Sequence, residues 1–405
     1  MNAAIHSTEG ALILVLNCGS SSIKFALFAA SHSGVAQQPE WSGKVEGIGR
    51  EKTLYRAGSL PAETLVFEPE QAHHEALAHI REKVVEQLAG RRLHAVAHRV
   101  VHGGSKYFAP VRIDAAVLAD LKAYVPLAPL HQPFALEAIE VLLESRPDIA
   151  QVACFDTAFH HTVPQVEQML ALPYDAWERG LRRYGFHGLS YEYQSLVLEQ
   201  RFGSVARGKV IVAHLGSGAS LCAMENLASV GTTMGFSALD GLMMGTRCGA
   251  LDPGAVIYLM EIEKLSLEKV AHVLYHESGL LGISGVSADP PVLLAQEDRQ
   301  DETGERIRAA LALYVRRIVR EIGALTAVLG GLDMLVFTAG IGEHSAVLRQ
   351  RICDELKFVG PVLDGEANAR NASVISTADS RIVVGVEPAN EEWVAARHAA
   401  LAVLS

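Results

Sequence analysis

Three turns built from glycine and serine are the residues of this chain best suited to hold a phosphate. Leu12–Phe28 (LILVLNCGSSSIKFALF) and Lys209–Met224 (KVIVAHLGSGASLCAM) each read as an apolar strand, a small-residue turn and a second strand. Val336–Ser345 (VFTAGIGEHS) reads as a strand that passes a glycine-rich corner into a helix. Such turns leave backbone N–H groups and hydroxyls to face a phosphate. The two matched hairpins predict a duplicated fold that clasps a nucleotide between its halves.

The size and composition of the chain indicate an α/β protein of two domains. Its 405 residues exceed the usual ceiling of about 250–300 for one hydrophobic core. Hydrophobic residues make up 49% of the chain, glycine occurs 35 times and the mean hydropathy is +0.19, all typical of compact enzymes. A net charge of −11 argues against nucleic acid or an anionic membrane as the main partner.

The cysteines and the N-terminus favour a cytoplasmic protein. No two cysteines form a Cys-x-x-Cys pair, so they are interpreted as scattered buried thiols of a reducing compartment. They are Cys18, Cys154, Cys222, Cys248 and Cys353. The segment MNAAIHSTEG lacks the basic residues of a signal peptide, and no stretch approaches the roughly 18 apolar residues that cross a bilayer.

The periodicity of apolar residues outlines the order of the elements. We expect helices over 70–88, 133–145, 306–329 and 391–404, and strands over 40–45, 53–56, 93–101, 152–155, 334–338 and 381–386. The acidic stretch 296–305 reads as a solvated loop. The predicted domains are 1–156 together with the terminal helix 391–405, and 157–390.

The motifs together resemble one family. They include LNCGSSSIKF from Leu16, HRVVHGG from His98, APLHQP from Ala128, FDTAFH from Phe155, YGFHG from Tyr184, HLGSGAS from His214, MGTRCG from Met244, SGLLGISGVS from Ser278, FTAGIGE from Phe337 and NEE from Asn390. This set, in this order, is similar to the acetate kinase family, within the superfamily of acetate and sugar kinases, heat-shock cognate proteins and actin.

The resemblance implies a fold and an activity. The fold would be the duplicated, actin-like or ribonuclease H-like α/β fold of two-domain kinases, with a central active-site cleft. The activity would be reversible, ATP-dependent phosphorylation of a short carboxylate to an acyl phosphate, with Mg²⁺ or, as a substitute, Mn²⁺. It also implies a homodimer formed through the second domain.

Four residues are predicted to carry the chemistry. Arg99 and Arg247 are the expected clamps, since a planar guanidinium binds a carboxylate or phosphate through two parallel hydrogen bonds. His187 matches the family histidine that donates to the oxygens of the transferred phosphoryl group. Asp156 matches an aspartate to which the family assigns proton transfer. Because a carboxylate substrate is already ionised at neutral pH, we interpret Asp156 as ordering Mg²⁺, its waters or an arginine.

The resemblance also assigns the metal and the nucleotide. Asn17 and Glu391 match the magnesium positions, and oxygen ligands acting partly through water suit that ion. Lys24 matches a nucleotide contact. The nucleotide phosphates would lie along His214, Leu215, Gly216, Ser217 and Gly218. The ribose and adenine would contact Ser284, Gly285, Val286, Gly340, Ile341, Gly342 and Glu343.

Departures from the family pattern concern the substrate more than the catalytic groups. Ser217 stands in place of an asparagine, Gly231 in place of an aspartate and Tyr191 in place of a second histidine. Ala238 replaces a proline beside the pocket for the substrate methyl group, so that pocket is predicted to be larger and to accept propionate after acetate. The apolar residues expected around the acyl group are Val101, Leu130 and Phe186.

Two other readings of the sequence remain open. One is a superfamily kinase acting on propionate, butyrate or a polyol, although Arg99 and Arg247 favour a carboxylate. The other is a nucleotide-switched ATPase of the actin or heat-shock type. Such proteins need a peptide-binding extension or a filament surface, and two kinase domains leave no room in this chain for an obvious extra module. An acyl phosphate made here would exchange with acyl-coenzyme A through a partner phosphate acyltransferase.

Overall fold

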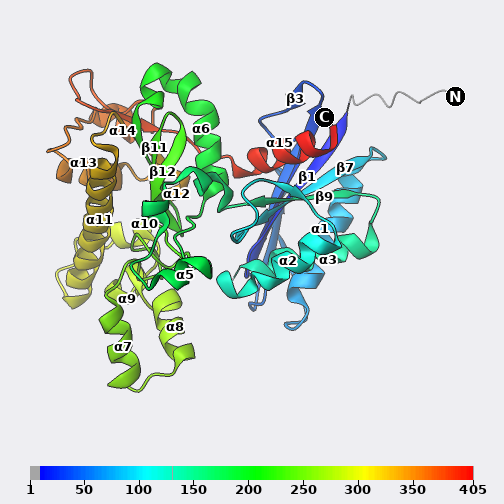
Figure 1. Cartoon of the computed structure of the whole chain (residues 1–405), viewed down its shortest axis with the longest axis horizontal. Coiled ribbons are helices and arrows are strands. Elements are labelled where there is room, and N and C mark those ends of the chain that lie inside the picture. The colour runs from blue at the N-terminus through cyan, green and yellow to red at the C-terminus, as the bar shows by residue number, and fades with distance from the viewer. Residues whose placement is uncertain (1–9, 130, 405) are drawn as a thin grey trace. The chain divides into compact units, whose positions relative to one another are not determined.

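The chain folds into two compact units, shown in Figure 1. The computed structural model describes residues 10–129 and 131–404. The first unit contains the residues up to Phe159 and those from Asn390 onward, and the second is His160–Ala389. These limits fall close to the expected domain limits at 156/157 and 390/391.

The first unit is built on a mixed sheet in the strand order β6-β5-β4-β2-β1-β7-β9-β8, with β3 on β2. Its strands are β1 (Ala11–Cys18), β2 (Ser22–Ser31), β3 (Gly34–Val35), β4 (Trp41–Glu46), β5 (Thr53–Ala57), β6 (Glu63–Leu65), β7 (Leu93–Val100), β8 (Val111–Arg112) and β9 (Ala150–Phe155). The central strand β1 is antiparallel to β2 and parallel to β7, which is parallel to β9.

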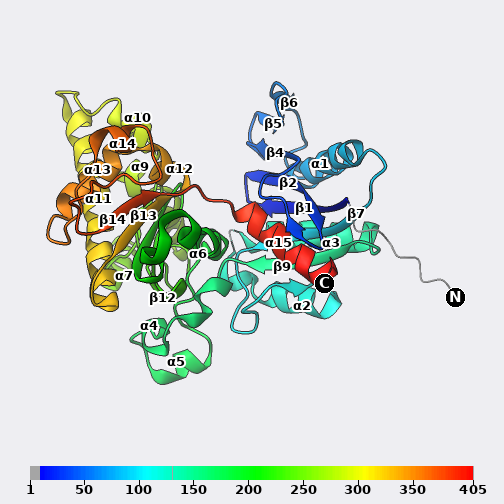
Figure 2. The same ribbon diagram turned by 90° about the horizontal axis from the view of Figure 1, so that it is seen from above.

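Helices cover both faces of this sheet (Figures 1 and 2). On one face α1 (Ala72–Leu88) and α3 (Gln132–Ser145) close a core around Leu12, Leu14 and Leu16, with α2 (Ala115–Ala123) beside α3. On the other face α15 (Glu391–Leu404) packs against β1, β2, β7 and β9. The last helix of the chain therefore belongs structurally with its first strands.

The second unit repeats the same central arrangement. Its sheet has the order β12-β11-β10-β13-β14, formed by β10 (Lys209–Leu215), β11 (Ala219–Glu225), β12 (Ala228–Thr232), β13 (Met334–Thr338) and β14 (Val383–Val386). Again the central strand is antiparallel to its hairpin partner and parallel to the next strand. Strands β4-β2-β1-β7-β9 and β12-β11-β10-β13-β14 match one for one. The predicted duplication is confirmed.

The helices of the second unit flank this sheet. They are α4 (Gln165–Gln168), α5 (Tyr174–Glu178), α6 (Gly188–Phe202), α7 (Pro253–Glu261), α8 (Leu267–His276), α9 (Gly279–Ser284), α10 (Pro290–Leu294), α11 (Glu302–Leu329), α12 (Ala339–His344), α13 (Ala346–Glu355) and α14 (Gly365–Ala369). Short 3-10 turns lie at Val125–Leu127, Ala158–Thr162 and Gly203–Arg207. None of the described helices is long and apolar enough to cross a bilayer.

One local prediction was wrong in part. The acidic stretch 296–305 is not all loop, because Asp301 accepts a hydrogen bond from the backbone of Gly304 and caps α11, which begins at Glu302. The third glycine-rich segment passes from a strand, β13, into a helix, α12, as predicted. The chain turns at Ala339, which adopts a left-handed conformation (φ 64°), and Gly340 and Gly342 lie inside α12.

Burial in the first sheet makes one histidine, His98, harder to protonate. The ring Nε2 of His98 in β7 lies 2.7 Å from Oε1 of Gln151 in β9, and the Gln151 amide donates to the carbonyl of Ile139. His98 is therefore the donor to Gln151 and is neutral. Burial lowers the pKa of His98 to about 4.

We expect the free energy of unfolding to fall as the pH drops from about 6.5 to about 4. In that window the unfolded chain binds a proton at His98 that the folded chain rejects, a loss of up to roughly 3 kcal/mol. The variant His98→Gln keeps an amide donor and should flatten this slope in urea titrations at several pH values, whereas the control His344→Gln, at an exposed position, should not. An unchanged slope in His98→Gln would contradict the assignment.

Candidate active site

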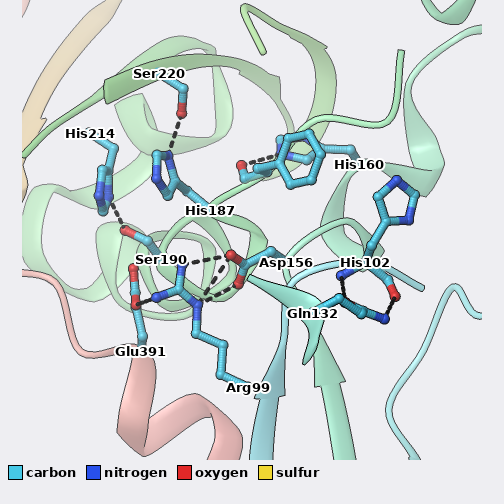
Figure 3. Close-up of polar contacts among 11 residues, drawn as sticks. Arg99, His102, Gln132, Asp156, His160, His187, Ser190, His214, Ser220 and Glu391 are labelled. Carbon is cyan, nitrogen blue, oxygen red and sulfur yellow. Dashed lines mark hydrogen bonds and ion pairs between the residues drawn. The ribbon is translucent and has the colours of Figure 1, made fainter. Parts of the chain in front are cut away.

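In the first unit an arginine is held between two carboxylates (Figure 3). Arg99, near the end of β7, donates from Nε to Oδ1 of Asp156 (2.9 Å) and from Nη2 to Oδ2 of Asp156 (2.6 Å). Its Nη1 lies 3.4 Å from Oε2 of Glu391, the first residue of α15. Asp156 follows β9 directly. The parallel strands β7 and β9 end at the same edge, which brings these residues together.

The electrostatics of this group are strong. Asp156 is 2% exposed, and the side chains of Arg99 and Glu391 are only 21% and 16% exposed. Burial by itself would lower the pKa of Arg99, but the carboxylates of Asp156 and Glu391 outweigh it and raise that pKa. Burial raises the pKa of Asp156, against the effect of Arg99. One guanidinium between two carboxylates leaves a surplus of negative charge.

The other predicted residues of the first unit lie on the same sheet. Asn17 and Lys24 are direct partners across β1 and β2, Asn17 half-buried and Lys24 exposed. Lys24 lines a pocket of about 370 Å³ together with Lys44 and Arg56. Val101 follows β7 and is half-buried, and the predicted acyl-pocket residue Leu130 lies outside the described residues. Basic side chains thus line this pocket from three neighbouring strands, β2, β4 and β5.

In the second unit two histidines are fixed by a reciprocal pair of hydrogen bonds (Figure 3). Nδ1 of His187, the residue before α6, lies 2.8 Å from Oγ of Ser220 in β11. Nδ1 of His214 in β10 lies 2.8 Å from Oγ of Ser190 in α6. The two rings stack with centroids 4.1 Å apart and planes at 17°. Each ring is therefore held through Nδ1 by a serine of the opposite element.

His187 is held in a strained backbone conformation. Its φ of 58° lies in the left-handed region that non-glycine residues rarely adopt. Such strain persists only where the surrounding contacts enforce it, and it is concentrated at functional positions. The strained backbone of His187 is therefore consistent with its predicted functional role.

The second phosphate-type turn lies against these side chains. A methyl group added at Gly218 would stand 3.3 Å from Nε2 of His187 and 3.8 Å from Nη1 of Arg247. One added at Gly216 would stand 3.9 Å from Nε2 of His214. Glycine at these positions lets the turn Gly216-Ser217-Gly218 approach both imidazoles and the guanidinium. Leu215, by contrast, is a buried residue at the end of β10.

Arg247 differs from Arg99 in its surroundings. Its Nη1 donates to the carbonyl oxygen of Ala238 at 3.0 Å, and burial lowers the pKa of Arg247. No carboxylate forms an ion pair with Arg247 among residues 10–129 and 131–404. The predicted acyl-pocket residue Ala238 thus contacts a predicted clamp residue. Phe186, also predicted there, is buried, and its carbonyl oxygen is bonded to Nε2 of His160 at 3.0 Å.

The remaining predicted nucleotide residues occupy two segments of the second unit. Ser284 ends α9, and its Oγ accepts from the backbone N–H of Val286, which fixes the turn through Gly285. Gly340, Ile341, Gly342 and Glu343 lie in α12.

One important residue was missed by the sequence reasoning. Arg349, 1% exposed, donates from Nη1 to the carbonyl oxygens of Gly342 and Glu343, both at 2.8 Å, and from Nε to Asn368 at 2.8 Å. It therefore fixes the C-terminal end of α12. An arginine within an amphipathic helix reads as a surface residue, so the sequence carried no signal for it. Ser190 and Ser220 were also missed, although both lie within or next to the quoted motifs FHG and GAS.

Comparisons with known proteins show which family the chain belongs to. The model of the acetokinase family matches residues 12–397. An acetate kinase of Rhodopseudomonas palustris is 47% identical over 393 residues, covering 96% of this chain and 97% of the relative. An acetate kinase of Rhizobium meliloti is 43% identical over 97% of this chain and 98% of the relative.

Solved structures give the same result. A propionate kinase from Francisella tularensis matches with a TM-score of 0.87 and 34% identity, covering 96% of this chain and 98% of that one. An acetate kinase from Porphyromonas gingivalis matches with a TM-score of 0.84 and 34% identity, covering 98% and 100%. The predicted fold class, a duplicated actin-like α/β fold, is confirmed. The chain belongs to the acetokinase family.

We expect Gly218→Ala to raise the dissociation constant for ATP about tenfold, since the new methyl group would crowd Nε2 of His187 and displace the phosphates. Calorimetric titration measures this. The backbone of Gly218 does not need positive φ, so the melting temperature should hardly change. Gly365→Ala, where an added methyl meets no atom within 4 Å, is the matched control. Unchanged affinity in Gly218→Ala would show that phosphates do not approach this turn.

Proposed function

We propose that the protein is an acetate kinase, which transfers the γ-phosphoryl group of ATP to acetate and gives acetyl phosphate and ADP, reversibly. The observation that carries the proposal is Arg247, a half-buried cation beside the turn Gly216–Gly218 and His187. Its guanidinium donates to a carbonyl oxygen and to a thioether sulfur. A charge partly removed from water needs compensation. A bound phosphoryl group or carboxylate would supply it.

The residues divide into two tasks. In direct in-line transfer the protein positions two anions and neutralises the charge of the moving phosphoryl group. His187 and Arg247 would donate to the phosphoryl oxygens, and the turn Gly216–Gly218 would hold the neighbouring phosphates with backbone N–H groups. Arg99 would bind the carboxylate of acetate. Lys24 and the segments Ser284–Val286 and Gly340–Glu343 would hold the rest of the nucleotide.

The donor set of the first unit fits Mg²⁺. The described residues contain no cluster of three or more His, Cys, Asp or Glu side chains arranged to hold a metal. Mg²⁺, however, keeps several waters and uses one or two carboxylates together with substrate phosphates. Glu391 and Asn17 offer oxygen ligands. Asp156 already neutralises Arg99, so the carboxylate of Glu391 is the surplus negative charge, and it favours a cation on the Glu391 side. When bound, Mg²⁺ would neutralise phosphate charge, and Mn²⁺ could replace it.

Asp156 would act as the orienting partner of Arg99 and not as a base. Both of its carboxylate oxygens accept hydrogen bonds from that guanidinium. Acetate is ionised at neutral pH and has no proton to give up. Of the roles considered from the sequence, ordering an arginine is the one that these contacts support.

Propionate would be a second substrate. Ala238 is smaller than the proline of the family pattern, and one methylene is worth only about 1–3 kcal/mol of discrimination. The likeness to a propionate kinase structure favours the same proposal. The acyl group would contact Val101, Leu130, Phe186 and Ala238.

The wider setting is also proposed. Residues 157–390 would form the nucleotide-binding domain and the homodimer contact, and 1–156 with 391–405 the other domain. The enzyme would work in the cytoplasm on small molecules, bind neither nucleic acid nor membrane, and exchange its product with a phosphate acyltransferase.

The test is acyl phosphate formation, trapped with hydroxylamine, from Mg-ATP with acetate, propionate, butyrate or glycerol. We expect acyl hydroxamate from acetate, less from propionate, and a loss of at least about a hundredfold in Arg247→Ala, because a transition-state clamp is removed. In Ala238→Pro the propionate-to-acetate ratio of kcat/KM should fall about threefold or more.

Each arm has a contrary result. Release of ADP without acyl hydroxamate would leave a polyol kinase or a switching ATPase and would remove the roles of Arg99 and Arg247. A better rate with propionate than with acetate would make the protein a propionate kinase. An unchanged ratio in Ala238→Pro would show that this position does not set acyl specificity.

A further inference from the structure

A buried chain of hydroxyl groups leads to His187. The phenol oxygen of Tyr191 in α6 lies 2.5 Å from Oγ of Ser220 in β11, which lies 2.8 Å from Nδ1 of His187. Tyr191 and Ser220 are both 0% exposed. A hydroxyl group isolated from water must make its hydrogen bonds inside the protein. This chain is therefore a fixed part of the site.

The hydrogen bonds of this chain can run in two directions, and the acidity of its groups selects one of them. Ser220 has one proton, so it can donate to Tyr191 or to His187 but not to both. A phenol is a stronger acid than an aliphatic alcohol and is the better donor of the two. If Tyr191 donates to Ser220, the serine proton is left to donate to Nδ1 of His187. Nδ1 then accepts, and the proton of the neutral imidazole must sit on Nε2.

This direction suits the position of Nε2. The Nε2 edge of His187 faces Gly218, at the same place that Nη1 of Arg247 approaches. A protonated Nε2 would donate to an anion held in the turn Gly216–Gly218. The opposite tautomer would present a lone pair to the same anion and would repel it.

We propose that Tyr191 is a positioning residue that acts through Ser220 to hold His187 in the tautomer that carries its proton on Nε2. The proposal rests on the proposed function for its catalytic consequence, but not for the tautomer itself. Tyr191 touches His187 through a serine and is not a catalytic residue. The stacked ring of His214, fixed by Ser190, keeps the imidazole of His187 in the plane that this chain requires.

The type of residue at 191 matters for this role. A phenol O–H or an imidazole N–H can donate to the oxygen of Ser220, whereas phenylalanine has no donor. Replacing Tyr191 by histidine should therefore keep the direction of the chain, and replacing it by phenylalanine should not.

The experiment compares Tyr191→Phe and Tyr191→His with the unaltered protein. The first readout is the ¹⁵N NMR spectrum of ring-labelled histidine without substrate, in which protonated and unprotonated ring nitrogens are distinct; His187→Gln assigns the signals. The second readout is kcat and KM for acetyl phosphate formation. Tyr193→Phe, which removes a buried phenol of the same helix bonded to Glu387, is the matched control.

We expect His187 to carry its proton on Nε2 in the unaltered protein and in Tyr191→His, and to show a mixture of tautomers in Tyr191→Phe. In Tyr191→Phe, kcat should fall roughly tenfold, the equivalent of one neutral hydrogen bond, with little change in KM. Tyr191→His should recover most of this loss, and Tyr193→Phe should leave both tautomer and kcat unchanged. Ser220→Ala should repeat the tautomer mixture if Tyr191→Phe does not fold.

Two results would overturn the proposal. One is a proton on Nδ1 of His187 in the unaltered protein, and the other is an unaltered Nε2–H tautomer in both Tyr191→Phe and Ser220→Ala. The spectra need no substrate, so they test the chain of hydrogen bonds even if no acyl phosphate is formed. Absence of acyl phosphate with an Nε2–H tautomer that depends on Tyr191 would reject the proposed function alone.

Discussion

The pairing of Arg99 with Asp156 and Glu391 is the interaction on which the first unit most depends. It joins the ends of β7 and β9 to the start of α15. The last helix of the chain is thereby bound to the first unit by an ion pair. Removing Arg99 would leave the buried carboxylate of Asp156 without its ion-pair partner, a loss of about 3–5 kcal/mol. The same group fixes the direction of the guanidinium, which a flexible surface arginine could not keep. The hydrogen bonds between Arg99 and Asp156 would therefore both stabilise the first unit and hold Arg99 in place to recognise a carboxylate.

In the second unit hydrogen-bond donors, and not carboxylates, gather at the proposed site. Arg247 is bonded to a carbonyl oxygen, and His187 and His214 are each held through Nδ1 by a serine, so one guanidinium and two imidazoles gather at the turn Gly216–Gly218. The first unit has a surplus of negative charge, which suits a divalent cation, and the second has donors that suit a phosphate. A reaction of a metal-bound nucleotide with a carboxylate needs both kinds of site.

The sequence predicted the features that depend on local pattern, and it failed where distant contacts decide. Alternation and turn residues located both hairpins and four helices, α1, α3, α11 and α15, because burial and turn chemistry act over a few residues. The passage from strand to helix at 336–345 was predicted, but nothing local shows that Ala339, and not a glycine, adopts the left-handed conformation at the corner. Motif resemblance selected Arg99, Asp156 and His187, but their partners could not be read from spacing. Arg349 was invisible because its bonds to the backbone of α12 are tertiary.

A double-mutant cycle on Arg99 and Asp156 would test the central claim most directly. The quantity measured is kcat/KM for acetate in Asp156→Asn, Arg99→Lys and the double variant, since lysine keeps the charge but loses the two parallel hydrogen bonds. If Asp156 acts only by orienting Arg99, Asp156→Asn should cost little more, within about threefold, once Arg99 is lysine. Losses that multiply in the double variant would show that Asp156 acts on the reaction independently, as a base or metal ligand would, and would contradict the account.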